Sequence, residues 1–222
     1  MQRSCVIVAS VSDAAEVIPL PLLAERLPGA PDENLDAVLD ATVECIARYG
    51  LAKTSLSDIA RELGVAPSTV YRKVGTVENA VRLVMAREGH RQLERMPDVI
   101  KGIEGPRIIT VFLAETITAT ANHPMVAKIL NDETDWMGKL ATRTLDERLA
   151  DGAAAAVPFL ASAMDAGFVR RQDPTALAHW LVRISTICLM SPPPGDLRQA
   201  LDDLLLPMLT PVPETPPTRR RR

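Results

Sequence analysis

The residues best suited to binding chemistry lie in segment 54–74, TSLSDIARELGVAPSTVYRKV. Val70 and Val74 have the spacing of a buried helix face, which leaves polar side chains on the outside of the same short helix. These outward groups are two hydroxyls, a phenol and two cations: Ser68, Thr69, Tyr71, Arg72 and Lys73. Such groups contact the phosphates and base edges of DNA. The alternative is an ordinary helical hairpin in a core, which has no need of this outward face. The segment therefore predicts a DNA-binding surface.

Two short helices joined by a tight turn must hold this surface in place. The first begins after Thr54 or Ser55, either of which can cap it, and ends at Gly64, where a left-handed residue carries no steric cost. Its apolar side chains recur every three or four residues: Leu56, Ile59, Ala60 and Leu63. Pro67 fits only the first turn of the second helix, because it lacks an amide hydrogen. The pattern predicts a helix-turn-helix, whose second helix enters the major groove of DNA.

Composition favours an all-α fold. Aromatic residues make up 3% of the 222-residue chain, and the helix formers Ala and Leu are abundant. No run of about 18 apolar residues could span a membrane. The apolar N-terminal run ends at Asp13 without a cleavage pattern, so we expect no secretory signal. Cys5, Cys45 and Cys188 are odd in number and far apart, which suits a reducing environment. We therefore expect a cytoplasmic protein.

The sequence lacks the motifs of enzymes and metal sites. It contains no nucleophile elbow, no Gly-rich phosphate loop and no Cys-x-x-Cys pair. Its three histidines, His90, His123 and His179, do not have the spacing of metal ligands. We expect no catalysis, no cofactor and no metal.

The net charge of the chain does not by itself indicate DNA binding. The chain carries a formal charge of −3, and residues 32–80 hold five basic and eight acidic side chains. Most of these acids precede the helix-turn-helix, whereas Lys53, Arg72 and Lys73 flank the DNA-reading segment. Because few cations are present to neutralise phosphates, we expect DNA affinity to depend on dimerisation and to fall less steeply with salt than that of a highly basic protein.

The chain divides into four sections. Residues 1–31 contain four prolines and no sustained period, which predicts a flexible leader, either an upstream start-site extension or an arm that touches DNA. Residues 32–80 form the small DNA-binding domain, with a first helix near 33–48 and a fourth helix from about Thr76. Residues 81–210 form a larger domain that is helical throughout. Residues 211–222 form a disordered Pro-rich tail whose four final arginines either aid solubility or add a non-specific DNA contact.

Helix-breaking residues set the predicted helices of the larger domain. The fourth helix continues to about Met96 and stops before Pro97. Further helices are predicted over about 106–121, 125–130, 174–190 and 196–209. A long segment over about 133–166 is expected to bend or break at Gly152 and Pro158.

The order of these features resembles the TetR family of bacterial transcriptional repressors. The shared motif is a helix ending at Tyr49-Gly50, then Thr54-Ser55-Leu56, Asp58-Ile59-Ala60, Gly64-Val65 and Thr69-Val70-Tyr71-Arg72-Lys73-Val74. The rest of the chain resembles the family only in length and helical layout. The resemblance implies an N-terminal three-helix helix-turn-helix domain. It also implies that residues 81–210 are an effector-binding and dimerisation domain, with an apolar ligand pocket and a dimer built from the last two helices.

The resemblance further implies roles for the matched residues. Thr54 and Thr69 would contact phosphate through their hydroxyls, and Tyr71 through its phenol. Ser68 and Arg72 would lie in the major groove.

Three more positions complete this comparison. Lys73 would reach the DNA backbone. Val77 stands where the family often has a lysine at the start of the fourth helix, so one phosphate contact is missing, and Val74 replaces a frequent aromatic. The full predicted DNA-binding set is Lys53, Thr54, Ser55, Pro67, Ser68, Thr69, Tyr71, Arg72 and Lys73.

Large apolar side chains in the second domain suggest a ligand pocket, although core packing explains any single one of them equally well. The candidates are Ile109, Phe112, Leu113, Trp136, Met137, Leu140, Phe159 and Trp180. The last two helices have wide apolar faces that one small domain cannot cover, which predicts pairing with a second copy. The candidate interface residues are Trp180, Ile184, Ile187, Leu201, Leu205 and Met208.

These features together predict a ligand-responsive repressor that binds a palindromic double-stranded DNA operator as a homodimer and is released by a small apolar effector. The alternative is a helical protein-interaction scaffold that has lost operator binding, favoured by the acidic first helix and by Val77. We expect no membrane partner.

Overall fold

The computed structural model describes residues 29–132 and 145–212. Residues outside these ranges include 1–28 of the predicted leader, the pocket candidates Trp136, Met137 and Leu140, and residues 213–222 of the predicted tail. Every regular element in the described ranges is a helix, as the sequence predicts. The elements are η1 (Glu33–Leu35), α3 (Asp36–Tyr49), α4 (Leu56–Leu63), α5 (Pro67–Val74), α6 (Val77–Val99), α7 (Arg107–Asn122), α8 (Pro124–Asp132), α10 (Leu145–Asp165), α11 (Pro174–Met190) and α12 (Leu197–Leu209).

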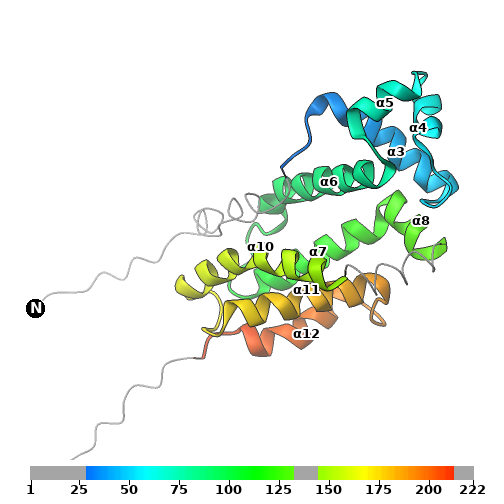
Figure 1. Ribbon diagram of the computed structural model, residues 1–222. Helices are drawn as coiled ribbons and strands as arrows, with labels where there is room; N and C mark the ends of the chain where they lie inside the picture. Colours follow the sequence, from blue (N-terminus) through cyan, green and yellow to red (C-terminus); the bar gives the residue numbers. More distant parts are fainter. Residues whose placement is uncertain (1–28, 133–144, 213–222) are drawn as a thin grey trace, which may run out of the picture.

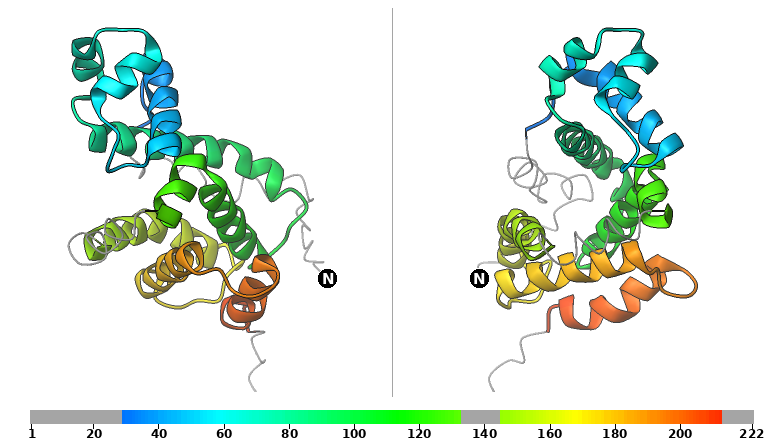
Figure 2. Two further views of the ribbon diagram at one scale, coloured as in Figure 1. Left: turned by 90° about the vertical axis from the view of Figure 1, so that its right-hand side faces the viewer. Right: turned by 45° about the vertical axis from the view of Figure 1, so that its right-hand side comes forward.

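The described chain forms two lobes connected by α6 (Figure 1). Helices α3, α4 and α5 form the small lobe, and helices α7 to α12 form the larger one. Because α6 runs unbroken from Val77 to Val99, it crosses the predicted domain boundary after residue 80. Helices α11 and α12 lie at the end of the molecule farthest from α4 and α5 (Figure 2).

The small lobe has a core of its own. Ile59 and Ala60 of α4 and Val70 and Val74 of α5 are buried in it. Helix α3 contributes Val38, Ala41 and Cys45. Burial raises the pKa of the Cys45 thiol, so this cysteine stays protonated and unreactive at neutral pH.

Helix α7 forms the centre of the larger lobe and packs against α11 and α12. One buried polar contact fixes it to α12. The carboxylate of Asp202 accepts a hydrogen bond from the Thr110 hydroxyl and another from Arg107, whose Nε lies 3.1 Å away. This contact holds α12 in place from inside the lobe.

The sequence predicts a bend or a break at Gly152 and Pro158. The break is wrong, because α10 continues through both residues. Gly152 faces α11, where an added Cβ would lie 3.4 Å from Val182 Cγ1. The missing side chain therefore lets α10 and α11 approach closely. Packing along this contact keeps the helix intact at both residues.

The predicted helix end before Pro97 is also wrong, because α6 extends to Val99. Pro97 lies in the last turn of α6, and the amide of Ile100 still donates to the carbonyl of Met96 at 3.0 Å. Met96 and Ile100 are both buried in the core of the larger lobe. Their burial stabilises the final turn despite the backbone hydrogen bond that proline cannot make.

Candidate nucleic-acid interface

A reciprocal cap fixes the start of α4. The Asp58 amide donates to the Ser55 hydroxyl oxygen at 3.3 Å, and the Ser55 amide donates to the Asp58 carboxylate at 3.0 Å. The hydrogen bonds from Ser55 lower the pKa of Asp58, with a further contribution from Arg61. This capping box satisfies two backbone amides that a helix start otherwise leaves without partners.

Gly64 ends α4 in the left-handed conformation, with φ of 66°. The next amide, that of Val65, donates back to the carbonyl of Ala60 at 3.0 Å. Pro67 then occupies the first turn of α5, as the sequence predicts. The tight turn sets the direction in which α5 leaves α4.

Helix α5 presents a polar outer face. Val70 and Val74 are buried beneath it, whereas the Tyr71 side chain is 64% exposed. Pro67, Ser68, Arg72 and Lys73 are exposed with it, and Thr69 is half-buried. Among the described residues, Arg72 has neither an ion pair nor a hydrogen-bond partner, so its guanidinium is free to bind an anion.

Four predicted contact residues lie just before α4 or already have partners. Thr54 is buried, and its hydroxyl donates to the carbonyl of Gly50 at 2.7 Å, so it is not a free phosphate donor in this structure. Ser55 is exposed but engaged in the capping box, and Lys53 is exposed beside it. Lys73 donates to the carbonyl of Asn34 across the lobe at 2.5 Å.

Asn79 joins α5 to α6, a role that sequence reasoning missed. Its side-chain amide donates to the carbonyl of Val74 at 2.8 Å, and its backbone amide donates to the Thr76 hydroxyl at 3.1 Å. The end of α5 is thereby attached to the start of α6. An asparagine in the third position of a helix carries no sequence signal of this role.

Two of the acids on the first helix are neutralised within the protein. Arg87 of α6 is buried and contacts Asp36 at 3.0 Å and Asp40 at 2.8 Å on α3. Burial acts to lower the pKa of Arg87, but the hydrogen bonds that it donates to Asp36 and Asp40, together with the nearby negative charges, outweigh burial, so the net shift of this pKa is upward. The acidic helix therefore repels DNA less than its composition predicts.

Helix α8 of the larger lobe packs directly on the small lobe. Met125 and Ile129 of α8 are buried against Leu39 and Ile46 of α3, with Val84 of α6 completing the cluster. The interlobe contact thus rests on α8 as well as on the shared helix α6. The sequence predicted a short helix here but not its partner.

His123 lies between α7 and α8 near this contact. Burial lowers the pKa of its imidazole, the charge of Arg87 acts in the same direction, and Glu88 opposes both. Its Nδ1 is buried with no hydrogen-bond partner in the described structure. The ring is therefore held neutral at physiological pH.

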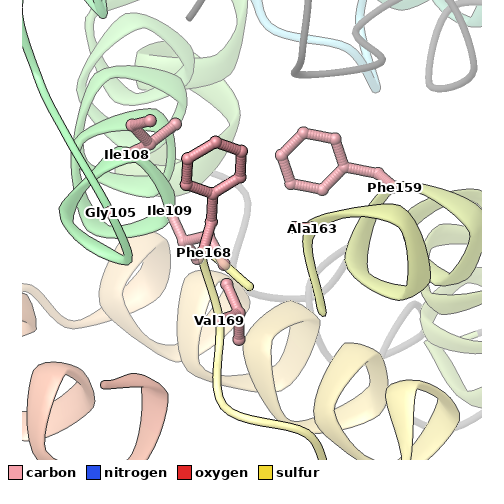
Figure 3. Close-up of a pocket in the computed structure, with 7 residues that line it drawn as sticks. All are labelled: Gly105, Ile108, Ile109, Phe159, Ala163, Phe168 and Val169. Carbon is pink, nitrogen blue, oxygen red and sulfur yellow. The ribbon is translucent and has the colours of Figure 1, made fainter. Parts of the chain in front are cut away.

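The larger lobe contains a small apolar pocket between α7 and α10 (Figure 3). It encloses about 280 Å³ of space not filled by atoms, part of it open to solvent. Phe159 and Phe168 extend towards it from different segments, as Figure 3 shows. The lining residues are Gly105, Ile108, Ile109, Phe159, Ala163, Phe168 and Val169, none of which has a polar side chain.

The predicted pocket residues divide between this pocket and other places. Ile109 and Phe159 line it, and Phe112 stacks on Phe159 with 6.3 Å between ring centroids. Leu113 is partly buried against the surrounding core. Trp180 does not line the pocket, since its side chain is 62% exposed on α11.

The predicted interface residues also divide. Trp180, Ile187 and Met208 are exposed on α11 and α12. Leu201 and Leu205 are instead buried in the core of their own chain, because the face that includes them turns towards α7. Ile184 is partly buried against the same core. The exposed apolar residues that the predicted set omitted are Met190 and Leu204.

Within the described ranges, no three His, Cys, Asp or Glu side chains are grouped as a metal site would need. None of the helices described is long and apolar enough to cross a membrane.

The fold and the outward face of α5 define a helix-turn-helix protein with a larger helical domain attached. Residues 38–73 match the family model described as bacterial regulatory proteins, tetR family. Over residues 38–73 the chain therefore matches the TetR family, which confirms the resemblance predicted from its motif.

Several solved structures share the overall fold of this chain. A TetR-family transcriptional regulator from Pectobacterium atrosepticum has a TM-score of 0.57 at 16% identity, covering 80% of this chain and 94% of that one. The fatty acid degradation regulator FadR from Bacillus halodurans has a TM-score of 0.54 at 18% identity, covering 79% and 94%. FadR from Bacillus subtilis, solved in complex with stearoyl-CoA, has a TM-score of 0.53 at 20% identity, covering 80% and 98%. A comparison with curated proteins finds no match.

Proposed function

We propose that this chain is a transcriptional repressor that binds a palindromic operator as a homodimer and releases it when a small apolar effector binds. The outward face of α5 carries the proposal. Ser68, Tyr71 and Arg72 project from an eight-residue helix whose other side is anchored by Val70 and Val74. This helix can enter the major groove, while the exposed Tyr71 phenol reaches phosphate.

A dimer is needed to give this short helix sufficient affinity. The exposed apolar side chains of α11 and α12 lie at the far end of the molecule from α5, so a partner there leaves both DNA-binding lobes free. Two copies of α5 about 34 Å apart would read half-sites in successive major grooves.

The packing of α7 and α8 supports a route from effector to DNA. Helix α7 lines the apolar pocket with Ile108 and Ile109, and it leads directly through His123 into α8. Met125 and Ile129 of α8 pack on α3 of the DNA-binding lobe. An effector that moves α7 away from α10 therefore shifts α8 and α3, and α6 offers a second connection. By reciprocity, bound DNA weakens effector binding by the same factor.

The pocket lining favours an effector with an aliphatic portion. No lining side chain offers a hydrogen bond, so the part of the effector held there is hydrocarbon. Two of the similar structures are FadR proteins, one of which contains stearoyl-CoA, and this favours fatty acyl compounds as the first class to test. Because the free space is small, an acyl chain enters only when α7 and α10 separate.

Selection from random double-stranded DNA tests operator binding. Wild-type protein is expected to enrich a palindrome whose half-sites lie about one helical turn apart. The variant Tyr71→Ala/Arg72→Ala should lose this enrichment while remaining a dimer, whereas Arg198→Ala, which removes an exposed cation from distant α12, should retain it. If the chain is instead a scaffold that has lost operator binding, neither wild type nor either variant would enrich a DNA sequence.

A further inference from the structure

The exposed face of α11 contains one charged group among apolar side chains. Trp180, Arg183, Ile187 and Met190 follow one another at intervals of three or four residues and so lie along one side of the helix. Trp180, Ile187 and Met190 are 62%, 63% and 49% exposed, and Arg183 is partly buried between them. A partner that covers this stripe must also cover the guanidinium.

Among the described residues, Arg183 has no carboxylate partner. Its Nη1 donates to the carbonyl of His179 at 3.1 Å and lies 3.2 Å from Nδ1 of the same residue. These contacts hold the guanidinium in the stripe without neutralising its charge. Covering an unpaired cation with apolar surface removes its hydration without compensation, so the partner is expected to supply an anion.

Helix α12 carries the matching anion. Asp203 is exposed next to Leu204, which is 58% exposed, and Met208 follows one turn later. The Asp203 carboxylate accepts a hydrogen bond from Gln199 at 2.8 Å but has no cation partner among the described residues. The exposed apolar residues of α12, Leu204 and Met208, thus lie beside one carboxylate without a cation partner among the described residues.

Arg183 and Asp203 lie at similar distances from the connection between α11 and α12. Helices α11 and α12 run in opposite directions and are joined by residues 191–196 (Figure 2). Arg183 comes seven residues before the end of α11, and Asp203 comes six residues after the start of α12. Each therefore lies about 10 Å from the connection.

We propose that Arg183 of one copy pairs with Asp203 of a second copy, and that this pairing selects identical chains as dimer partners. In a two-fold symmetric contact, a residue that meets a partner residue is met by it in return, so the interface contains two such pairs. The inference rests on the proposed homodimer and adds the residues that determine partner choice. Apolar stripes alone fit many helices, whereas a wrong partner would leave both charges unpaired.

Charge reversal tests the pairing in the full-length chain, with the dimer dissociation constant measured by sedimentation. In the Arg183→Glu variant, both symmetric contacts bring two carboxylates together. In the Asp203→Arg variant, both contacts bring two guanidinium groups together. Each variant should weaken the homodimer at least about 100-fold. The double variant should restore it, and so should an equimolar mixture of the two single variants, whose heterodimer regains both pairs.

Arg198→Glu makes the same charge change on α12 outside the stripe and should leave the dissociation constant unchanged. Circular dichroism checks helix content. Where Arg183→Glu is unfolded, the folded Asp203→Arg variant is compared with Arg198→Glu, and only Asp203→Arg should weaken the homodimer. A wild-type monomer at all concentrations overturns the proposed homodimer together with this pairing. A wild-type dimer that single reversals do not weaken, or that neither the mixture nor the double variant restores, overturns the pairing and leaves the homodimer standing.

Discussion

Nη2 of Arg87 on α6 lies 2.8 Å from Oδ1 of Asp40 on α3, and Nη1 of the same guanidinium lies 3.0 Å from Asp36. The guanidinium is buried, whereas both carboxylates remain partly exposed. One side chain of the connecting helix thus orients the first helix of the small lobe and neutralises part of its acidity.

Replacing Arg87 with Ala should lower both stability and DNA affinity. Because its carboxylate partners stay in contact with water, the expected loss in unfolding free energy is about 1–2 kcal/mol, below that of a fully buried pair. DNA affinity falls because Asp36 and Asp40 regain their full negative charge beside the DNA-binding surface. Urea denaturation and DNA titration measure the two effects. The more exposed Arg91→Ala is the matched control, and an equal loss in both variants would contradict the role given to burial.

Gly64→Ala should destabilise the turn before the recognition helix α5. Its φ of 66° is left-handed, where an added Cβ costs roughly 1–2 kcal/mol. Gly29→Ala is the control, because a Cβ at either position meets open space but Gly29 has no positive φ. Thermal unfolding at one protein concentration compares them. Equal stability of the two variants would show that the backbone conformation of Gly64 does not matter.

The lowered pKa of His123 leads us to expect a loss of stability in mild acid. Its pKa is lower in the folded chain than in the unfolded chain, so the unfolded chain binds the proton more readily. The stabilising contribution of the neutral ring is complete above pH of about 6.5 and is lost as the pH falls through the folded pKa. Unfolding free energies at pH 7 and pH 5 should therefore differ more for wild type than for His123→Asn. Identical differences in both proteins would rule out this contribution.

The helices that the sequence predicts well are those whose ends carry local chemistry. Asp173 and Asp196 accept hydrogen bonds from the amides of Thr175 and Gln199, so α11 and α12 begin where their capping residues indicate. Gly64 and Pro67 define the turn before α5 in the same way. Pro97 and Gly152 were misleading because long-range packing stabilises the helices through them.

The periodicity of the sequence does not predict which helices pack against each other. Leu201 and Leu204 are both apolar residues of α12, yet one faces α7 and the other faces solvent. The polar face of α5 was predictable because valines at two positions fix which side is buried. The contact of Met125 with α3 and that of Arg87 with Asp40 join segments far apart in sequence, and neither leaves a local signal.

The most direct test of the account is the affinity of the selected operator for wild-type protein and for Arg72→Ala, measured by fluorescence anisotropy at several salt concentrations. Loss of a base contact by Arg72 should weaken binding by about 1–3 kcal/mol, or roughly 5- to 150-fold, with the dimer unchanged in sedimentation. Wild type should also prefer the operator to a scrambled duplex at every salt concentration. A folded wild-type dimer that binds both duplexes equally, or an Arg72→Ala variant with full operator affinity, would contradict the assignment of α5 as the helix that reads DNA.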